Sequence, residues 1–308
     1  METRLYSAIC TPLTEEETLH KDGFKEHIDQ QFNNGIYGVL ICGTMGNMQL
    51  LKDEVYRDAV KYGTEFSAQK GEVFIGVGDA SYSRTLARIE FAQQFDVDGL
   101  VVLCPYLVKY SQDELVDYFS ALADASSKPV YLYDLPVLAG MKISHDTVLK
   151  LSKHPNIHGA KCSDIWEDTR ILMGKVNSDF RIIPAQPFLV DHLVRMGVSD
   201  NLDGVYSICP EYISLLADTA ASGNVEKASQ MQSRLSSFLM NMRNNFPLHD
   251  AFSAILNRRA VQGQIALRPM KRMIERQREE LFEIEFVKQI TGNNRGKTIQ
   301  NTKEVINV

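Results

Sequence analysis

Lys161 closes a short apolar segment, which is an unusual position for a charged side chain. The segment ends Gly159-Ala160-Lys161-Cys162, and burying an ammonium group there is costly. Burial depresses the pKa of lysines in general, and a neutral amine can attack a ketone to form a Schiff base. A lysine that extends into solvent just past the segment is the alternative interpretation. We therefore treat Lys161 as the candidate nucleophile.

Residues with hydroxyl groups stand at the ends of other apolar segments, as Lys161 does in its own. Tyr133 begins Tyr133-Asp134-Leu135-Pro136 and could transfer protons as a general acid or base, although a lone tyrosine also serves as a core aromatic. In Gly43-Thr44-Met45-Gly46, two glycines let the backbone approach a ligand closely. The exposed amides and the Thr44 hydroxyl could hold a carboxylate, and an ordinary tight turn is the alternative. Another phenol, Tyr106, follows Cys104-Pro105.

The spacing of the cysteines and the context of the histidines give no indication of a metal or a cofactor. The five cysteines all lie at predicted strand ends, at Cys10, Cys42, Cys104, Cys162 and Cys209. Without Cys-x-x-Cys spacing, they are interpreted as small buried apolar side chains, with a thiol-sensitive rim as the alternative. Their odd number argues against a disulfide framework. His154 and His158 are four residues apart, but both lie in polar or turn contexts and are interpreted as surface residues, so we predict no metal site.

The elements that carry these residues alternate between strand and helix. Eight short apolar segments recur with helical periodicity between them: Leu5–Cys10, Gly38–Cys42, Val73–Val77, Leu100–Cys104, Val130–Tyr133, Ile157–Lys161, Arg181–Ile183 and Gly204–Ile208. Their continuous apolar character is typical of parallel strands covered on both faces. The pattern predicts an α/β fold, a (β/α)8 TIM barrel, in which active sites lie at the C-terminal ends of the strands. The alternative, an open doubly wound sheet, lacks a Gly-x-Gly-x-x-Gly turn.

A small C-terminal helical extension should follow the barrel. We predict a barrel over residues 1–223, a helical unit over 224–291 and an extended or disordered tail over 292–308. The helical unit should contain helices at Asn224–Met242, Asp250–Gln262 and Pro269–Glu283.

Composition narrows the classes of partner. The chain has 308 residues, 44% hydrophobic content and a net charge of −6, without a basic stripe for nucleic acid. It has no run of about 18 apolar residues and no signal-peptide pattern at its N-terminus. We expect a reduced, cytoplasmic, soluble protein whose partner is a small molecule rather than nucleic acid or a membrane.

The motifs together resemble those of the dihydrodipicolinate synthase / N-acetylneuraminate lyase family of class I aldolases. The resemblance covers nearly the whole chain. The matching segments are Ala8-Ile9-Cys10-Thr11-Pro12, Gly43-Thr44-Met45-Gly46-Asn47, Tyr133-Asp134-Leu135-Pro136, Gly159-Ala160-Lys161, Gly204-Val205-Tyr206-Ser207 and Arg268-Pro269-Met270.

This resemblance implies a role for each matching residue. Lys161 would form an imine with pyruvate or another 2-oxo acid, and Tyr133 would relay protons or hold the substrate carboxylate. Thr44 would link the relay, and the amides of Thr44 and Met45 would bind the carboxylate. The implied substrate-binding residues are Gly43, Met45, Gly46, Tyr106 and Ser207. The resemblance also implies a homotetramer, a dimer of dimers, that needs no metal or organic cofactor.

Several departures from the family pattern bear on the substrate. Leu107 stands where a second tyrosine is usual, which predicts a broken hydroxyl relay. Leu138 replaces the arginine that would bind the second substrate's carboxylate. Met45, Asn47 and Asp134 also depart from the pattern, as does the segment around Ala185-Gln186.

We therefore predict a Schiff-base lyase that acts on pyruvate or a 2-keto-3-deoxy sugar acid, by aldol cleavage or condensation or by dehydration. Dihydrodipicolinate synthase proper is one alternative. A diverged, non-catalytic barrel that binds a 2-oxo acid is another.

Overall fold

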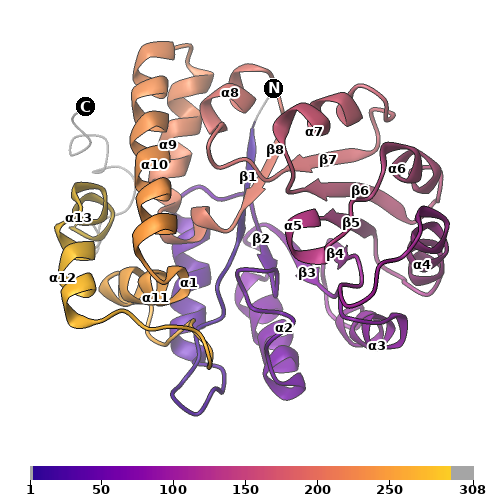
Figure 1. Cartoon of the computed structure of the whole chain (residues 1–308), viewed down its shortest axis with the longest axis horizontal. Coiled ribbons are helices and arrows are strands. Elements are labelled where there is room, and N and C mark those ends of the chain that lie inside the picture. The colour runs from indigo at the N-terminus through magenta and orange to yellow at the C-terminus, as the bar shows by residue number, and fades with distance from the viewer. Residues whose placement is uncertain (1–2, 293–308) are drawn as a thin grey trace.

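The computed structural model describes residues 3–292, and its centre is a barrel of parallel strands (Figure 1). The strands are β1 (Arg4–Ala8), β2 (Gly38–Ile41), β3 (Glu72–Gly76), β4 (Gly99–Leu103), β5 (Val130–Asp134), β6 (Ile157–Cys162), β7 (Arg181–Pro184) and β8 (Asp200–Asp203). Their hydrogen-bonded order is β7-β6-β5-β4-β3-β2-β1-β8. The predicted (β/α)8 TIM barrel is confirmed.

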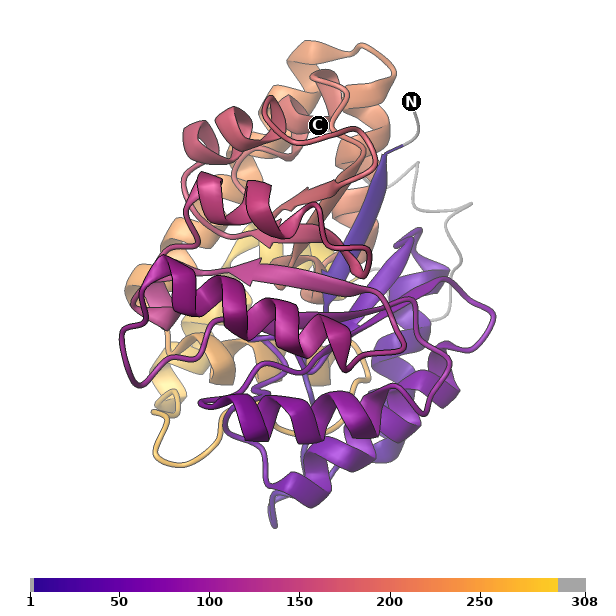
Figure 2. The same cartoon turned by 90° about the vertical axis from the view of Figure 1, so that its right-hand side faces the viewer.

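Helices cover the outside of this barrel, as the two views show (Figures 1 and 2). They are α1 (Lys21–Asn33), α2 (Asp53–Ser67), α3 (Tyr82–Ala92), α4 (Gln112–Asp124), α6 (His145–Leu151), α7 (Trp166–Met173), α8 (Val190–Arg195) and α9 (Pro210–Ala221). The short α5 (Pro136–Ala139) follows β5 directly. Local sequence sets these boundaries: Ser111 and Glu114, for example, form a reciprocal capping box at the start of α4.

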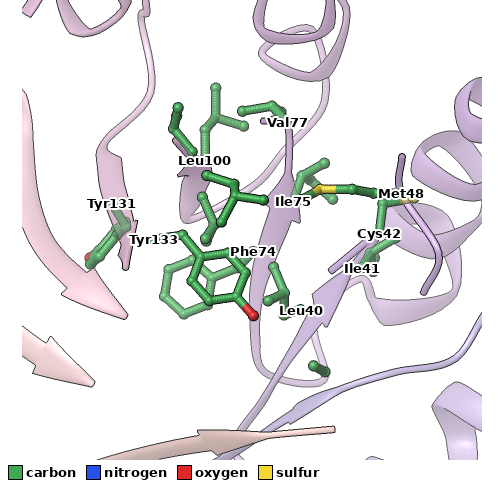
Figure 3. Close-up of a cluster of buried hydrophobic side chains, with 14 of the residues drawn as sticks. Leu40, Ile41, Cys42, Met48, Phe74, Ile75, Val77, Leu100, Tyr131 and Tyr133 are labelled. Atoms are coloured by element: carbon green, nitrogen blue, oxygen red, sulfur yellow. The ribbon is translucent and has the colours of Figure 1, made fainter. Parts of the chain in front are cut away.

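Apolar side chains from neighbouring strands are buried on both faces of the barrel wall. Leu40, Phe74, Ile75 and Leu100 are almost fully buried and gather with Tyr131 in one cluster (Figure 3). Burial of strand residues on both faces explains why the strands are continuous apolar segments in the sequence.

A group of charged side chains bridges β7 and β8 at the opposite end of the barrel from the strand C-termini. The Arg181 guanidinium on β7 donates from Nε to Asp200 Oδ2 on β8 at 3.3 Å and from Nη2 to Tyr6 Oη at 2.7 Å. Arg181 Nη1 also donates to Glu72 Oε2 at 3.1 Å, and Arg4 Nε lies 2.7 Å from Asp200 Oδ1. Side chains therefore join the two strands that stand at the ends of the hydrogen-bonded order.

The predicted position of the eighth strand is wrong. The strand is Asp200–Asp203, and Val205–Ile208 forms a 3₁₀ helix, η1, instead. The strand begins with the polar residues Asp200 and Asn201, so it lacks the apolar run that marks the others. Asp200 can be buried in a strand because two arginines distant in the sequence, Arg4 and Arg181, balance its charge.

The C-terminal helices pack against one side of the barrel (Figure 1). They are α10 (Val225–Asn245), α11 (Leu248–Arg258), α12 (Glu275–Glu283) and α13 (Glu285–Gly292). Phe286 on α13 stacks on Phe238 of α10 with ring centroids 4.5 Å apart, and it also meets Tyr212 of α9 edge-on. A second apolar core therefore joins these helices to the barrel.

The predicted helix Pro269–Glu283 starts too early, because α12 begins at Glu275. The preceding segment is held by Asp250 of α11, which accepts a hydrogen bond from the Met273 amide at 2.9 Å and pairs with Arg272 at 3.0 Å. The predicted tail lies outside the described residues, apart from Gly292. Within residues 3–292, no helix combines the length and the apolar character needed to span a bilayer.

Candidate active site

A cavity of about 430 Å³ opens at the C-terminal ends of the strands, where active sites of this fold lie. Four residues singled out from the sequence line it together: Lys161, Tyr133, Thr44 and Met45. They come from β6, β5 and the turn after β2. The barrel thus brings together residues that are more than 100 positions apart in the sequence.

Lys161 lies on β6 beside Tyr133 of β5, its partner in the strand register. Its side chain is buried, with a relative exposure of 4%. Nζ donates a hydrogen bond to Ser163 Oγ at 2.8 Å and lies 3.8 Å from the centroid of the Tyr133 ring. Among the described residues, no carboxylate forms an ion pair with it. The amine therefore reaches the cavity without a fixed counter-ion.

The hydroxyl groups of Thr44 and Tyr133 lie 3.1 Å apart, so a proton can pass directly between them. The turn that carries Thr44 is anchored by two hydrogen bonds, at Gly46 and at Asn47. Thr11 Oγ1 donates to the Gly46 carbonyl at 2.8 Å, and Asn47 Nδ2 donates to the Ile265 carbonyl at 2.8 Å. Among the described residues, no acceptor takes up the amides of Thr44 or Met45. The turn can thus present two amides to a carboxylate.

Four other predicted site residues do not line the cavity. Gly43 and Gly46 shape the turn instead. The Tyr106 hydroxyl donates to Asp79 Oδ1 at 3.2 Å, away from Tyr133. Ser207 is buried in η1, where its hydroxyl donates to the Gly204 carbonyl at 2.6 Å. For Ser207 the reason is the misplaced eighth strand, which puts this residue past the end of β8 rather than within it.

Two ionisable residues that the sequence reasoning missed also line the cavity: Asp203 and Arg243. Asp203 is the last residue of β8, and Arg243 projects from α10 with its guanidinium 4.9 Å from the centroid of the Phe188 ring. Burial raises the pKa of the Asp203 carboxyl, against the opposing effects of the Val205 amide and the charges of Lys161 and Arg243. A correct strand boundary would have pointed to Asp203, because it ends a strand.

The Met45 side chain packs against the backbone of Gly204 across the cavity. A Cβ at position 204 would lie 2.0 Å from Met45 Cγ and 3.0 Å from Met45 Cβ. Only glycine at this position leaves room for Met45. The pair therefore fixes the width of the cavity between the ends of β2 and β8.

The remaining walls are largely apolar. Leu135, Val137 and Leu138 line the cavity beside α5, and Ala185 lines it after β7. Leu107 does not contribute: its side chain is 78% exposed to solvent.

The cysteines are all free and buried. Burial raises the pKa of the Cys162 thiol, next to Lys161, to about 12, so this thiol is a poor nucleophile at neutral pH. Across residues 3–292, no cluster of three or more histidine, cysteine or acidic side chains is arranged to hold a metal ion.

Comparisons with known proteins show the family to which this chain belongs. The model of the dihydrodipicolinate synthetase family matches residues 1–288. The 4-hydroxy-tetrahydrodipicolinate synthase of Syntrophus aciditrophicus is 25% identical over 284 residues, covering 89% of this chain and 94% of that protein. The 4-hydroxy-tetrahydrodipicolinate synthase 1 of Streptomyces coelicolor is 29% identical over 238 residues, or 75% of each chain.

Solved structures share the fold. The E. coli K12 prophage protein YagE, in complex with pyruvate, superposes with a TM-score of 0.85 at 22% identity, covering 94% of this chain and 98% of that one. A Sulfolobus 2-keto-3-deoxygluconate aldolase in complex with D-KDPG gives 0.81 at 19% identity, covering 91% and 94%.

Proposed function

The chain belongs to the dihydrodipicolinate synthetase family, and from this premise we propose that it is a class I lyase whose Lys161 forms a Schiff base with a 2-oxo acid. One observation carries the proposal. The buried Lys161 amine lies 3.8 Å from the Tyr133 ring centroid, and the hydroxyl of that ring lies 3.1 Å from Thr44 Oγ1. A nucleophile and a proton relay thus occupy one cavity.

The chemistry follows from these groups. The free amides of Thr44 and Met45 bind the substrate carboxylate, which places the neighbouring ketone carbon near Lys161. Nζ attacks that carbon, and Tyr133 protonates the oxygen that leaves as water when the imine forms. The imine then accepts the electron pair that is released when the substrate's C3–C4 bond breaks in aldol cleavage, or when a proton leaves C3.

The cavity favours a 2-keto-3-deoxy sugar acid over aspartate semialdehyde. An apolar Leu138 cannot bind the carboxylate of a semialdehyde, whereas Asp203 and Arg243 offer polar contacts to the hydroxyl groups of a longer substrate. The structural relatives that bind pyruvate and D-KDPG support 2-oxo acids as a class.

A substrate panel tests this proposal. The purified chain is incubated with 2-keto-3-deoxy sugar acids, and released pyruvate is followed for aldol cleavage while mass spectrometry follows loss of water. Pyruvate with aspartate semialdehyde is the comparison reaction. Turnover of a sugar acid supports the proposal, and turnover of the semialdehyde alone favours dihydrodipicolinate synthase, as the names of the curated relatives suggest. Imine formation without any turnover would favour a non-catalytic binding barrel.

The proposal extends to a homotetramer in the cytoplasm. Apolar side chains at Leu50, Leu107 and Val108 are exposed on this monomer and would be covered by association. The five free, buried cysteines suit a reducing compartment. Light scattering on the purified chain tests the assembly, with a monomeric mass as the contrary result.

A further inference from the structure

We infer that Asp203 is a further catalytic residue of this site, the base that removes a proton from C3 of the substrate imine. The inference rests on the proposed function, because it requires an imine on Lys161. Removal of the C3 proton needs a base, and the Thr44–Tyr133 pair offers only hydroxyl groups, not a carboxylate.

Position is the first support. Asp203 is the last residue of β8, and it lines the same cavity as Lys161, Tyr133 and Thr44. It is the only carboxylic acid among the described residues that line this cavity. Catalytic side chains of this fold come from the C-terminal ends of several different strands.

The Asp203 carboxylate is oriented by a backbone hydrogen bond but, among the described residues, has no side-chain partner. The Val205 amide donates to Asp203 Oδ1 at 2.8 Å, which fixes the orientation of the group. Within the described part of the chain, no side chain donates a hydrogen bond to Asp203 or pairs with it within 4 Å. Most other buried carboxylates have such a partner, as Asp200 has in Arg4. A carboxylate without a side-chain partner remains available to a substrate.

The electrostatic surroundings suit a base. Three other ionisable side chains line the cavity: Lys161 from β6, Tyr133 from β5 and Arg243 from α10. Burial raises the pKa of the Asp203 carboxyl from 3.8, while the two cations limit that rise. A carboxylate with a raised pKa is a stronger base.

The rest of the site leaves this task open. Leu107 has no proton to transfer, and its side chain points into solvent rather than the cavity. Tyr106 donates its hydroxyl to Asp79 outside the cavity. Thr44 and Tyr133 can exchange protons with each other and with a leaving oxygen. Asp203 adds an acceptor at the end of β8.

The proposed step is balanced within the site. In the imine, the substrate's C2 is doubly bonded to the protonated Nζ of Lys161. Asp203 takes a proton from C3, and the C3–H electron pair becomes the C2–C3 double bond. The electron pair of the C2–N double bond moves onto Nζ, which becomes the neutral nitrogen of an enamine. Asp203 is then a neutral carboxylic acid, and return of its proton to C3 reverses the step without any oxidant or reductant.

Hydrogen exchange of pyruvate measures this step without a second substrate. In D2O, each reversal places a deuteron on the methyl group of pyruvate, which NMR follows as loss of the methyl proton signal. Imine formation is measured separately, by borohydride trapping and intact mass. The variant Asp203→Asn keeps an oxygen that can accept from the Val205 amide but removes the base. Its matched control is Asp164→Asn, because Asp164 lies just after β6 but contacts Lys142 at 3.1 Å and does not line the cavity.

We expect Asp203→Asn to trap pyruvate as fully as the unmodified chain while its exchange rate falls by about 100-fold or more. Asp164→Asn should exchange at the unmodified rate. Asp203→Glu, which retains a carboxylate, should exchange faster than Asp203→Asn, and it provides a second variant if the asparagine variant is unstable to heat.

Three results would overturn the inference: normal exchange by Asp203→Asn, equal losses in the asparagine and glutamate variants, or trapping without exchange by the unmodified chain. If the unmodified chain forms no adduct with pyruvate, the proposed function fails first, and the role of Asp203 fails with it.

Discussion

The Nζ atom of Lys161 lies 3.8 Å from the centroid of the Tyr133 ring. The two residues are partners in the register of β6 and β5, so the ladder itself holds them side by side. A cation over an aromatic face gains about 0.5–2 kcal/mol, more when it is removed from water. The strand pairing therefore places the nucleophile next to the phenol that would serve it.

Removing the Tyr133 hydroxyl should slow imine formation. Tyr133→Phe keeps the ring under Lys161 but loses the group that contacts Thr44, and we expect the rate of pyruvate trapping to fall by about 10²–10⁴-fold. Timed borohydride quenches followed by intact mass measure this rate. The matched control is Tyr131→Phe, two residues earlier on β5, whose hydroxyl accepts from Arg181 at 3.2 Å. Equal rates in the two variants would contradict the relay.

Adding a methyl group at Gly204 should displace Met45. Its Cβ would lie 2.0 Å from Met45 Cγ, so Gly204→Ala should lower the free energy of unfolding by about 1–3 kcal/mol. Met45→Ala in the same chain should recover most of that loss, because the clash disappears. Denaturant unfolding of the two single variants and the double variant measures the coupling. Additive losses would show that the two residues do not interact as the structure indicates.

Arg181 should be among the most important charges for stability. Arg181→Met leaves the carboxylates of Glu72 and Asp200 without this partner, and we expect a loss of about 3 kcal/mol in the free energy of unfolding. Arg276→Met, which breaks an exposed pair with Glu280, should change it by less than about 0.5 kcal/mol. Similar losses in both variants would mean that the group linking β7 and β8 adds little.

His27 should make the fold sensitive to acid. It is fully buried, its Nε2 accepts from the Cys10 amide at 3.3 Å, and burial lowers its pKa to about 3. The folded state keeps His27 neutral, whereas the unfolded chain binds a proton there below about pH 6.5. Stability should therefore fall by about 1.4 kcal/mol per pH unit from this one site as pH drops from about 6.5 toward 3.

Unfolding free energies measured across this pH range should change less steeply with pH in His27→Gln, by the contribution of one proton. The exposed His158 supplies the control variant His158→Gln, which should keep the slope. An unchanged slope in His27→Gln would contradict the account of this buried ring.

The sequence alone was sufficient for the fold and for seven of its eight strands, and it predicted that Lys161, Tyr133 and Thr44 lie at the C-terminal ends of strands. Seven strands could be predicted because each is an apolar segment, and Lys161 stands out because it closes one such segment, as Thr44 does because it follows another. β8 could not be placed, since its polar Asp200 is made a strand residue by Arg4 and Arg181, far away in the sequence. The same error concealed Asp203.

Side-chain direction and long-range packing also lie beyond sequence patterns. Tyr106 follows a strand as Tyr133 does, yet its hydroxyl turns to Asp79 rather than into the cavity. Arg243 reaches the cavity from α10, which follows the last strand by more than 20 residues. No local pattern marks a helix of the C-terminal unit as part of the site.

Borohydride trapping with pyruvate tests the central claim most directly. The chain is incubated with pyruvate, reduced, and analysed by intact mass and by peptide mapping, with Lys161→Ala as the control. We predict one added mass of reduced pyruvate per chain, located on Lys161 and absent from the variant. An adduct on another lysine, or none with pyruvate and longer 2-oxo acids, would contradict the assignment of Lys161 as the Schiff-base residue.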